Sequence, residues 1–281
     1  MKSPGIAEAA RRSRAPHGKV NRLLLPILAM LLFCGSVQAQ VISLAVSAGA
    51  GNSSTIYNTQ DTYRPFASLL GKALEAKVEA KPLLASSIKS SINGSQYPLL
   101  LVYTSDAAEA LRSKRYEAIG FSQDLGNNHI YFFARADSSA KRLADVGGRC
   151  VVASDPFAIA TGEAILKKEK LLEKVLSYKP VRESEALEFH LQTKFCEIAV
   201  FRSDTIAQKL AAAGHRQIHK TADFPVYVLL ADKKLGAAKI DQLRRLVVEF
   251  QPDPTSAFMK ETGIVTFITN QDSALELINL Y

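Results

Sequence analysis

Short apolar runs alternate with amphipathic segments along the chain after residue 40. The first four runs have the length and composition of buried strands and cover residues 41–47, 77–81, 98–103 and 116–121. Between the first two, apolar side chains recur with the helical period at Phe66, Leu69, Leu70, Ala73 and Leu74. We expect this helix to begin near Asp61, which would place Pro65 in the first turn, where proline is tolerated. The pattern predicts parallel strands connected by helices.

The same alternation restarts at Arg149 and continues to a helix that ends at Gly214. Strands are predicted at 149–153, 175–179 and 196–201, and helices from about residue 160, over 184–193 and from 203. A later apolar run at 226–231 is expected to pair back with the first group of strands, and amphipathic helices follow it. Two such units in one chain suggest a cleft between them.

The first forty residues have the features of a secretory signal peptide. Five basic residues lie between positions 11 and 22, and an apolar run of twelve residues follows from Leu23 to Cys34. This run is too short for a hydrocarbon core that requires about 20 residues, so an uncleaved anchor is the lesser alternative. Small residues around Ala39 predict cleavage after that position and a periplasmic chain that begins at Gln40.

The charge of the chain changes when this segment is removed. Residues 1–39 hold six basic residues and one acidic residue, so cleavage lowers the formal net charge from +8 to +3. A nucleic-acid-binding domain is expected to keep clustered Lys and Arg, so we predict no nucleic-acid partner. The 242 residues that remain are enough for two lobes with their own cores.

Motifs for catalysis or metal binding are weak. The chain has no GlyXxxSerXxxGly motif and no phosphate-binding glycine loop, and GlyAlaGly at 49–51 is too short to indicate one. His215 and His219 have an i, i+4 spacing, but no Cys, Asp or Glu nearby completes a metal site, so we interpret them as surface side chains. We therefore predict no enzyme activity, no catalytic residue, no metal and no cofactor.

Ligand-binding residues are expected where parallel strands end and helices begin. In the first unit these residues are Tyr103, Thr104 and Ser105. In the second unit they are Ser154, Asp155, Thr161, Gly162, Arg182, Glu183 and Ser203, with Ser184, Arg202 and Asp204 beside them. Hydroxyl groups and free backbone N–H groups at helix starts can hold an oxyanion. The alternative is that these Ser and Thr residues only cap helices and that Arg182 lies at a solvated strand end.

Three short segments carry a resemblance to a known family: TyrArgPro at 63–65, LeuAlaAspValGlyGlyArg at 143–149, and AspPro at 155–156 before a helix. With this order of elements, the chain resembles the phosphate, phosphite and phosphonate substrate-binding proteins of ABC transporters, which are type II periplasmic binding proteins. The resemblance covers nearly all of the chain after residue 40.

The resemblance implies an α/β fold of two lobes, each a mostly parallel sheet flanked by helices, with hinge strands between them. The expected organisation is a signal peptide at 1–39, lobe I at 40–124, lobe II at 125–224, and a return to lobe I with C-terminal helices at 225–281. It also implies a small oxyanion or phosphonate-like ligand bound in the cleft, delivery to an ABC permease, and a monomeric state. The alternative is a periplasmic sensor that presents its ligand to a membrane histidine kinase.

The resemblance also implies ligand-binding roles for Tyr103 and Arg182, and it shows one departure from the family pattern. Tyr103 matches the aromatic residue of the family's cleft, and Arg182 stands where aminophosphonate-binding relatives tend to carry histidine. Relatives follow AspPro with several Ser or Thr residues, whereas here only Thr161 among residues 157–162 has a hydroxyl group. The identity of the ligand therefore stays open.

Two cysteines follow the predicted cleavage site, Cys150 and Cys196. An even pair in an oxidising compartment is a disulfide candidate, and the alternative is that both are buried as small apolar residues. In the strand order of the family, the strands that begin at these residues are parallel neighbours. A bridge at that end of the sheet, opposite the cleft, would be geometrically possible.

Overall fold

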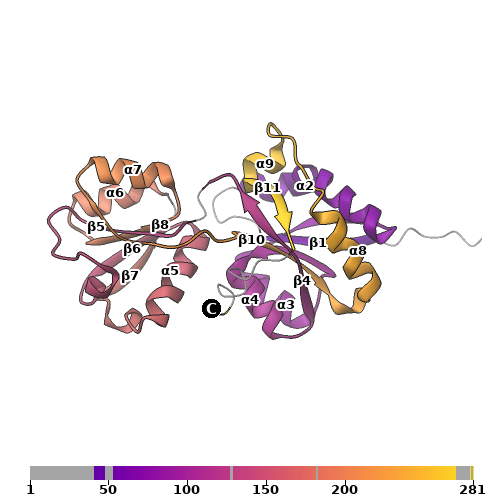
Figure 1. The fold of residues 1–281 in the computed structure, drawn as a ribbon, viewed down its shortest axis with the longest axis horizontal. Coiled ribbons are helices and arrows are strands. Elements are labelled where there is room, and N and C mark those ends of the chain that lie inside the picture. Colours follow the sequence, from indigo (N-terminus) through magenta and orange to yellow (C-terminus); the bar gives the residue numbers. More distant parts are fainter. Residues whose placement is uncertain (1–40, 48–52, 127–128, 182, 270–278, 280) are drawn as a thin grey trace, which may run out of the picture. The chain divides into compact units, whose positions relative to one another are not determined.

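The computed structural model describes residues 41–47, 53–126, 129–181, 183–269, 279 and 281. The predicted signal peptide and the predicted ligand residue Arg182 lie outside these ranges. The described strands form two separate sheets, each flanked by helices (Figure 1). None of the described helices is long and apolar enough to cross a membrane.

The first sheet has six strands in the order β11-β4-β10-β3-β1-β2. Their bounds are β1 Val41–Ser47, β2 Lys77–Leu83, β3 Leu99–Tyr103, β4 Tyr116–Asp124, β10 Tyr227–Asp232 and β11 Ile264–Ile268. Strand β1 is parallel to β2 and β3, whereas β10 is antiparallel to both β3 and β4 and lies between them. Strands β1 to β4 therefore run in one direction, and their carboxyl ends lie on the same edge of the sheet.

Helices cover both faces of the first sheet. They are α2 Ser53–Leu74, α3 Ile88–Gly94, α4 Thr104–Arg112, α8 Ala237–Val247 and α9 Ala257–Thr262. Figure 1 shows α2, α8 and α9 on one face and α3 and α4 on the other. Their apolar side chains follow the same division, since Phe66, Leu243 and Phe258 pack in one cluster and Ile92 and Ala107 pack in another.

The second sheet has five strands in the order β7-β6-β8-β5-β9. The bounds of its strands and helices are β5 Tyr131–Ala134, β6 Cys150–Ser154, α5 Pro156–Lys168, β7 Ser177–Val181, α6 Glu185–Gln192, β8 Ile198–Phe201, α7 Asp204–Ala212 and β9 Arg216–Lys220. Strand β6 is parallel to β7 and β8, and β5 is antiparallel to β8 and β9. The chain enters this sheet between β4 and β5 and leaves it between β9 and β10. Short 3-10 helices lie at Ala85–Ser87, Leu143–Val146, Leu172–Lys174 and Lys233–Leu235.

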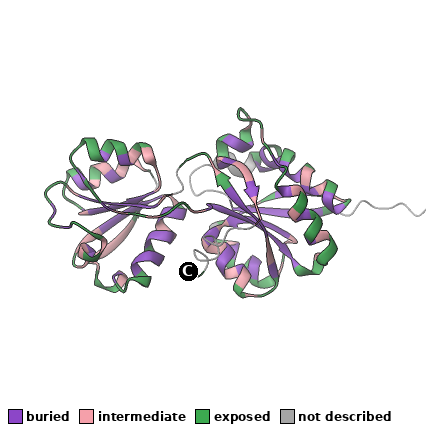
Figure 2. Cartoon of the chain, in the orientation of Figure 1, coloured by how far each residue is buried: buried purple, intermediate pink, exposed green. Residues whose placement is uncertain are grey.

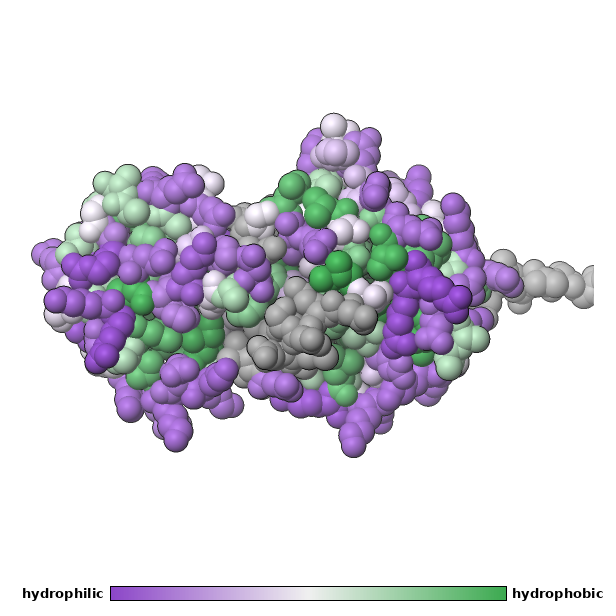
Figure 3. All heavy atoms as spheres, in the orientation of Figure 1, coloured by the Kyte–Doolittle hydropathy of each residue, from purple (hydrophilic) through white to green (hydrophobic). Residues whose placement is uncertain are grey.

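The central strands of both sheets are buried, the edge strands β7 and β9 are less so, and exposure increases toward the outer helix faces (Figure 2). Strand β3 is fully buried from Leu99 to Val102, and β8 is at most 1% exposed throughout. In the face seen in Figure 3, hydrophilic side chains cover much of the surface and apolar ones are limited to patches between them. Near-continuous apolar sequence in β3 and β8 is what strands covered by helices on both faces require.

Three expectations from the sequence are wrong. Helix α2 begins at Ser53 and not near Asp61, so Pro65 lies in its interior, where proline removes one backbone donor. Residues 264–268 form strand β11 within the segment for which helices were expected, because they pair with the free edge of β4. His215 is buried, and its Nδ1 accepts a hydrogen bond of 3.2 Å from the backbone N–H of Ala136.

The structure contains a disulfide between Cys150 and Cys196. Cys150 is the first residue of β6, Cys196 lies just before β8, and these two strands are parallel neighbours. Their Cα atoms are 4.7 Å apart, within the range of about 4.4 to 6.8 Å that a bridge requires. The bridge closes a loop of 46 residue steps at the amino ends of the strands, away from the edge where α5 begins.

Candidate functional site

Helix α4 begins directly at the carboxyl end of β3, and the side chain of its N-cap residue does not cap its start. Tyr103 is the N-cap residue, with extended backbone angles of φ −60° and ψ 151° and no side-chain hydrogen bond to the first turn. The first amides of a helix have no partner within the helix and carry a partial positive charge. The start of α4 can therefore attract an anion through the amides that follow Thr104.

Thr104 fixes this helix start to the strand that returns from the second sheet. Its backbone N–H donates to the carbonyl oxygen of Val226 at 3.1 Å, and its hydroxyl donates to the carbonyl oxygen of Pro225 at 2.5 Å. The residue is fully buried. Its hydroxyl thus holds two backbone segments together, while Ser105, the next residue, is only half-buried in the first turn.

Two tyrosines stack beside the start of α4. The rings of Tyr103 and Tyr227 have centroids 5.0 Å apart, and Tyr227 is the first residue of β10. Burial raises the pKa of both hydroxyl groups, so both carry their proton at neutral pH. Neutral tyrosines can donate hydrogen bonds and offer an apolar ring face.

An acidic residue lies behind these tyrosines at the end of β4. Ser122 accepts a 3.0 Å hydrogen bond from the Tyr227 N–H and donates one of 2.9 Å to Asp124 Oδ2. The other carboxylate oxygen, Oδ1, is inaccessible to solvent and has no hydrogen-bond partner within the described residues. Burial raises the pKa of Asp124 to about 6, and the hydrogen bonds from Ser122 and Val226 oppose this shift.

Helix α5 begins at the carboxyl end of β6, and here a side chain does cap the start. Asp155 has a positive φ of 72°, and its Oδ1 accepts hydrogen bonds from the N–H groups of Phe157 at 2.7 Å and Ala158 at 3.2 Å. The first residue of the helix is Pro156, which has no N–H to offer. The N–H of Ile159 donates to the Asp155 carbonyl oxygen at 2.9 Å. The first-turn donors of α5 are therefore all used within the chain.

The same carboxylate also binds a guanidinium group. Nη2 of Arg202, the residue after β8, lies 3.0 Å from Asp155 Oδ2, and the two side chains are 24% and 25% exposed. The guanidinium carbon is 5.9 Å from the centre of the Phe157 ring. Burial alone would lower the pKa of Arg202, but Asp155, Tyr227, Tyr103 and Asp124 together raise it.

The two helix starts are connected by aromatic contact, because the ring of Phe157 lies 6.4 Å from that of Tyr103. Tyr103, Tyr227, Phe157, Asp155 and Arg202 therefore form one cluster of aromatic and charged side chains. We call these five residues the aromatic–arginine cluster. Phe157 and Tyr227 are buried in it, Tyr103 is partly exposed, and its one cation is paired with Asp155.

The other predicted residues have internal contacts of their own. The Ser154 hydroxyl lies 3.3 Å from that of Ser184. Ser203 caps α7 by accepting from the Ile206 N–H at 3.3 Å, as the capping alternative expected. Glu183 is exposed and the structure does not place its side chain in the cluster.

Thr161 and Gly162 lie on the buried face of α5. The Thr161 hydroxyl donates to the Phe157 carbonyl oxygen at 2.7 Å, and its oxygen lies 2.5 Å from the hydroxyl of Tyr281. A Cβ atom at Gly162 would lie 2.6 Å from the Tyr178 hydroxyl and 2.8 Å from a methyl group of Val200. Close packing therefore explains the glycine.

Sequence reasoning did not assign a ligand role to Tyr227 or Phe157, and it placed Arg202 only beside the predicted set. Tyr227 lies at the beginning of an antiparallel strand, so the rule about carboxyl ends of parallel strands does not select it. Phe157 is an apolar residue in a helix and is typical of a core. No single-sequence signal separates either from an ordinary buried aromatic residue.

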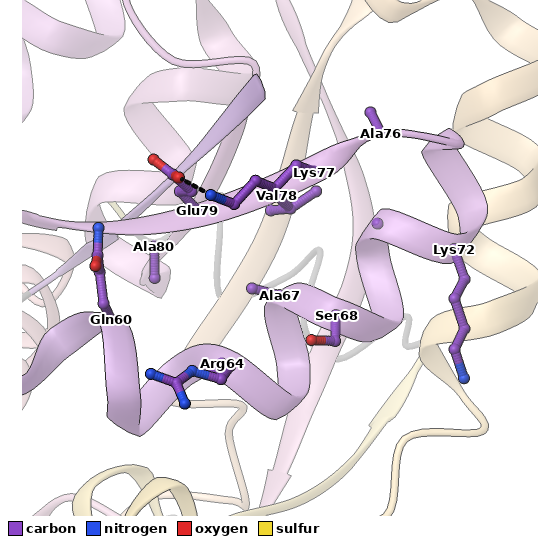
Figure 4. A pocket seen from close by; sticks show the side chains of 11 residues that line it. Gln60, Arg64, Ala67, Ser68, Lys72, Ala76, Lys77, Val78, Glu79 and Ala80 are labelled. Carbon is purple, nitrogen blue, oxygen red and sulfur yellow. Dashed lines mark ion pairs between the residues drawn. The ribbon is translucent and has the colours of Figure 1, made fainter. Parts of the chain in front are cut away.

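A groove also lies along the edge of the first sheet, between α2 and β2 (Figure 4). Its volume is about 570 Å³, and its lining includes Gln60, Arg64, Ser68 and Lys72 of α2 and Lys77 and Glu79 of β2. Lys77 and Glu79 form an ion pair of 2.7 Å. The groove follows the side of an edge strand, where lysines commonly prevent pairing with another chain. It is not at the carboxyl ends of the strands, so we do not choose it as the ligand site.

These features define a class of protein. The fold has two mixed α/β lobes linked by two crossings, and a cluster of aromatic and charged residues connects helix starts from both lobes. This is the two-lobed fold of type II periplasmic binding proteins. A model of the periplasmic substrate-binding proteins of phosphonate ABC transporters matches residues 54–275, and the chain belongs to that family.

Solved structures agree on the fold. XAC2383 from Xanthomonas citri, bound to ATP, is 12% identical with a TM-score of 0.64, over 85% of this chain and 94% of that one. PhnD1 from Prochlorococcus marinus, in complex with methylphosphonate, is 11% identical with a TM-score of 0.57, over 85% and 97%. A phosphonate transporter component from Pseudomonas aeruginosa is 15% identical with a TM-score of 0.56, over 86% and 85%. No curated protein sequence matches the chain.

Proposed function

We propose that this chain is exported, is cleaved after Ala39 and binds a small oxyanion or phosphonate-like ligand for an ABC permease. The ligand site lies between the lobes, which are formed by residues 40–124 with 225–281 and by residues 125–224. The observation that carries the proposal is the start of α4, which its own N-cap side chain does not cap and which lies beside the stacked Tyr103 and Tyr227. Membership of the family supports it.

The arrangement suits a ligand with an acidic head and a small apolar part. First-turn amides of α4 and the half-buried Ser105 would hold the oxyanion, because helix starts favour negative charge. The partly exposed ring of Tyr103 would cover the apolar part. The same site would serve the alternative function, a sensor for a histidine kinase, and the neighbouring genes would separate the two roles.

Thermal unfolding with added ligand tests the proposal. Methylphosphonate at 100 times its dissociation constant should stabilise the fold by about 2.7 kcal/mol. Tyr103→Ala should weaken binding by more than about 1 kcal/mol, as expected for an aromatic residue that contacts the ligand. The control is Tyr97→Ala, which removes a partly buried tyrosine from another cluster. If methylphosphonate, phosphate and methanesulfonate all leave the unfolding temperature unchanged, the proposal is wrong.

A further inference from the structure

The carboxylate of Asp155 is bound in the way that a ligand anion would be bound. One of its oxygens accepts hydrogen bonds from two helix N–H groups, and the other forms an ion pair with the guanidinium of Arg202. Helix N–H groups and an arginine are the donors that proteins commonly use for phosphate and other oxyanions. Asp155 thus occupies, from inside the chain, the donors that α5 and β8 would otherwise present to a ligand.

Two carboxylates interact electrostatically with Arg202. Asp155 binds it directly, and Asp124 at the end of β4 also acts on it electrostatically. The Oδ1 atom of Asp124 is buried and has no hydrogen-bond partner in the described part of the chain. With both carboxylates ionised, the surroundings of Arg202 are net negative. An incoming anion therefore meets an attractive guanidinium only if it replaces the contact with Asp155.

The backbone conformation of Asp155 also indicates that its contact with Arg202 has a functional role. A φ of 72° with a ψ of 127° is unusual for any residue other than glycine and costs free energy. The hydrogen bonds and the ion pair of the carboxylate hold the residue in this conformation. A ligand that binds Arg202 in place of Asp155 removes one of these restraints, the ion pair.

We propose that Asp155 is an internal competitor of the ligand, and that a bound oxyanion takes Arg202 from it. The inference rests on the proposed function and adds a determinant of specificity. A ligand must bind Arg202 better than a carboxylate does, which requires more negative charge or more acceptor oxygens. Phosphonate and phosphate groups meet this requirement, sulfonates meet it in part, and simple carboxylates do not.

Three acids with one methyl group each test this ranking: methylphosphonate, methanesulfonate and acetate. Their affinities for the purified protein are measured by isothermal titration calorimetry. The wild-type protein should bind methylphosphonate best and acetate worst. Asp155→Asn retains a residue that caps helices well and tolerates positive φ, but it removes the charge that holds Arg202. We expect this variant to bind methylphosphonate about ten-fold tighter or more, and to discriminate less among the three acids.

A double-mutant cycle isolates the role of Arg202. Arg202→Gln should weaken methylphosphonate binding by about ten-fold or more, and in that background Asp155→Asn should no longer tighten it. Asp155→Ser keeps a capping hydroxyl but is too short to reach Arg202, and it replaces Asp155→Asn if that variant does not fold. Asp137→Asn is the control, because it removes an exposed carboxylate that pairs with Arg135 and Lys194 instead.

The outcomes separate the inference from the proposed function. If the wild-type protein binds methylphosphonate and Asp155→Asn or Asp155→Ser binds it equally or more weakly, the inference is wrong and the proposed function stands. If neither the wild-type protein nor the variants bind any of the three acids, the proposed function fails and the inference with it. If only the Asp155 variants bind methylphosphonate, internal competition is supported.

Discussion

The starts of α4 and α5, one from each sheet, are closed in different ways. Each helix follows the carboxyl end of a parallel strand, β3 or β6. Hydrogen bonds from Thr104 to the carbonyl oxygens of Pro225 and Val226 fix α4, and its N-cap side chain does not cap it. Asp155 caps α5 and also binds Arg202. Two helices that follow parallel strands therefore do not have the same donors available, and of these two starts only that of α5 is capped by its own N-cap side chain.

The difference has a physical origin in the residue at the N-cap. Tyr103 cannot reach its own helix amides, and its ring packs on Tyr227 instead. Asp155 has the short carboxylate side chain that N-cap positions favour, followed by a proline at the first helical position. The first arrangement leaves donors for a ligand, and the second stabilises the helix at the cost of those donors.

The largest expected difference between the two sheets concerns the disulfide. Replacement of Cys150 and Cys196 by serine should lower the free energy of unfolding by about 4 kcal/mol, from the chain-entropy model for a loop of 46 steps. Because the bridge joins the ends of β6 and β8, amide exchange should accelerate in the second sheet and α5 more than around α4. Urea unfolding and hydrogen exchange measure both effects. Equal acceleration in the two regions would contradict the comparison.

The second prediction concerns the pH dependence of stability that Asp106 of α4 causes. Burial raises the pKa of Asp106, in the first turn, from 3.8 to about 6, and Glu109 adds to this shift. The folded state holds this proton more tightly than the unfolded state, so the stability from Asp106 is lost as pH rises from about 4 to about 6. Asp106→Asn should therefore be more stable than wild type at pH 7.5, by at most about 3 kcal/mol, and no more stable below pH 4.

Asp137 provides a control of opposite sign for this experiment. Hydrogen bonds from Arg135 and Lys194 lower its pKa to about 2, so its contribution is present at neutral pH and is lost in acid. Asp137→Asn should be less stable than wild type at pH 7.5. Chemical denaturation at the two pH values compares both variants. A stabilising effect of Asp106→Asn that did not change with pH would rule out ionisation as its cause.

A substitution at Gly162 tests how tightly α5 packs against its neighbours. An alanine Cβ would lie 2.6 Å from the Tyr178 hydroxyl and 2.8 Å from Val200, so we expect overpacking to cost about 1 to 3 kcal/mol. Gly147→Ala is the matched control, because its nearest neighbour, Lys174 Cβ, would be 3.6 Å away. Urea unfolding compares the two variants. If Gly162→Ala has full stability but loses ligand affinity, the glycine serves the ligand and not the packing.

The sequence predicts most of the fold because burial sets the pattern of apolar residues. Strands β3 and β8 are buried on both faces, so their runs are nearly continuous and easy to find. The alternating pattern of β11 is weaker, because three of its five residues are only half-buried. The beginning of α2 was missed because few apolar residues mark residues 53–60.

The candidate site is less predictable for a different reason. Sequence alone indicates which residues end strands, and it selected Tyr103 and Asp155 on that basis. It does not indicate which side chains from distant segments meet, so the pairing of Asp155 with Arg202 and the stacking of Tyr103 on Tyr227 were not foreseen. Whether a donor is free or already used depends on these tertiary contacts.

The smallest expected effect tests whether Asp155 contributes to stability through its cap or through its charge. Asp155→Ala removes the acceptor for two N–H groups and should cost about 0.5 to 2 kcal/mol. Asp155→Gly should cost only a few tenths, since glycine is tolerated at N-caps and adopts a φ of 72° without strain. Asp155→Asn keeps the acceptor and should also lie within a few tenths of wild type if the cap dominates. Urea unfolding ranks the three variants, and a loss in Asp155→Asn as large as that in Asp155→Ala would assign the stability to the Arg202 ion pair. In that case α5 would be held by a contact that a ligand can break, and binding at Arg202 would weaken the helix start that it approaches.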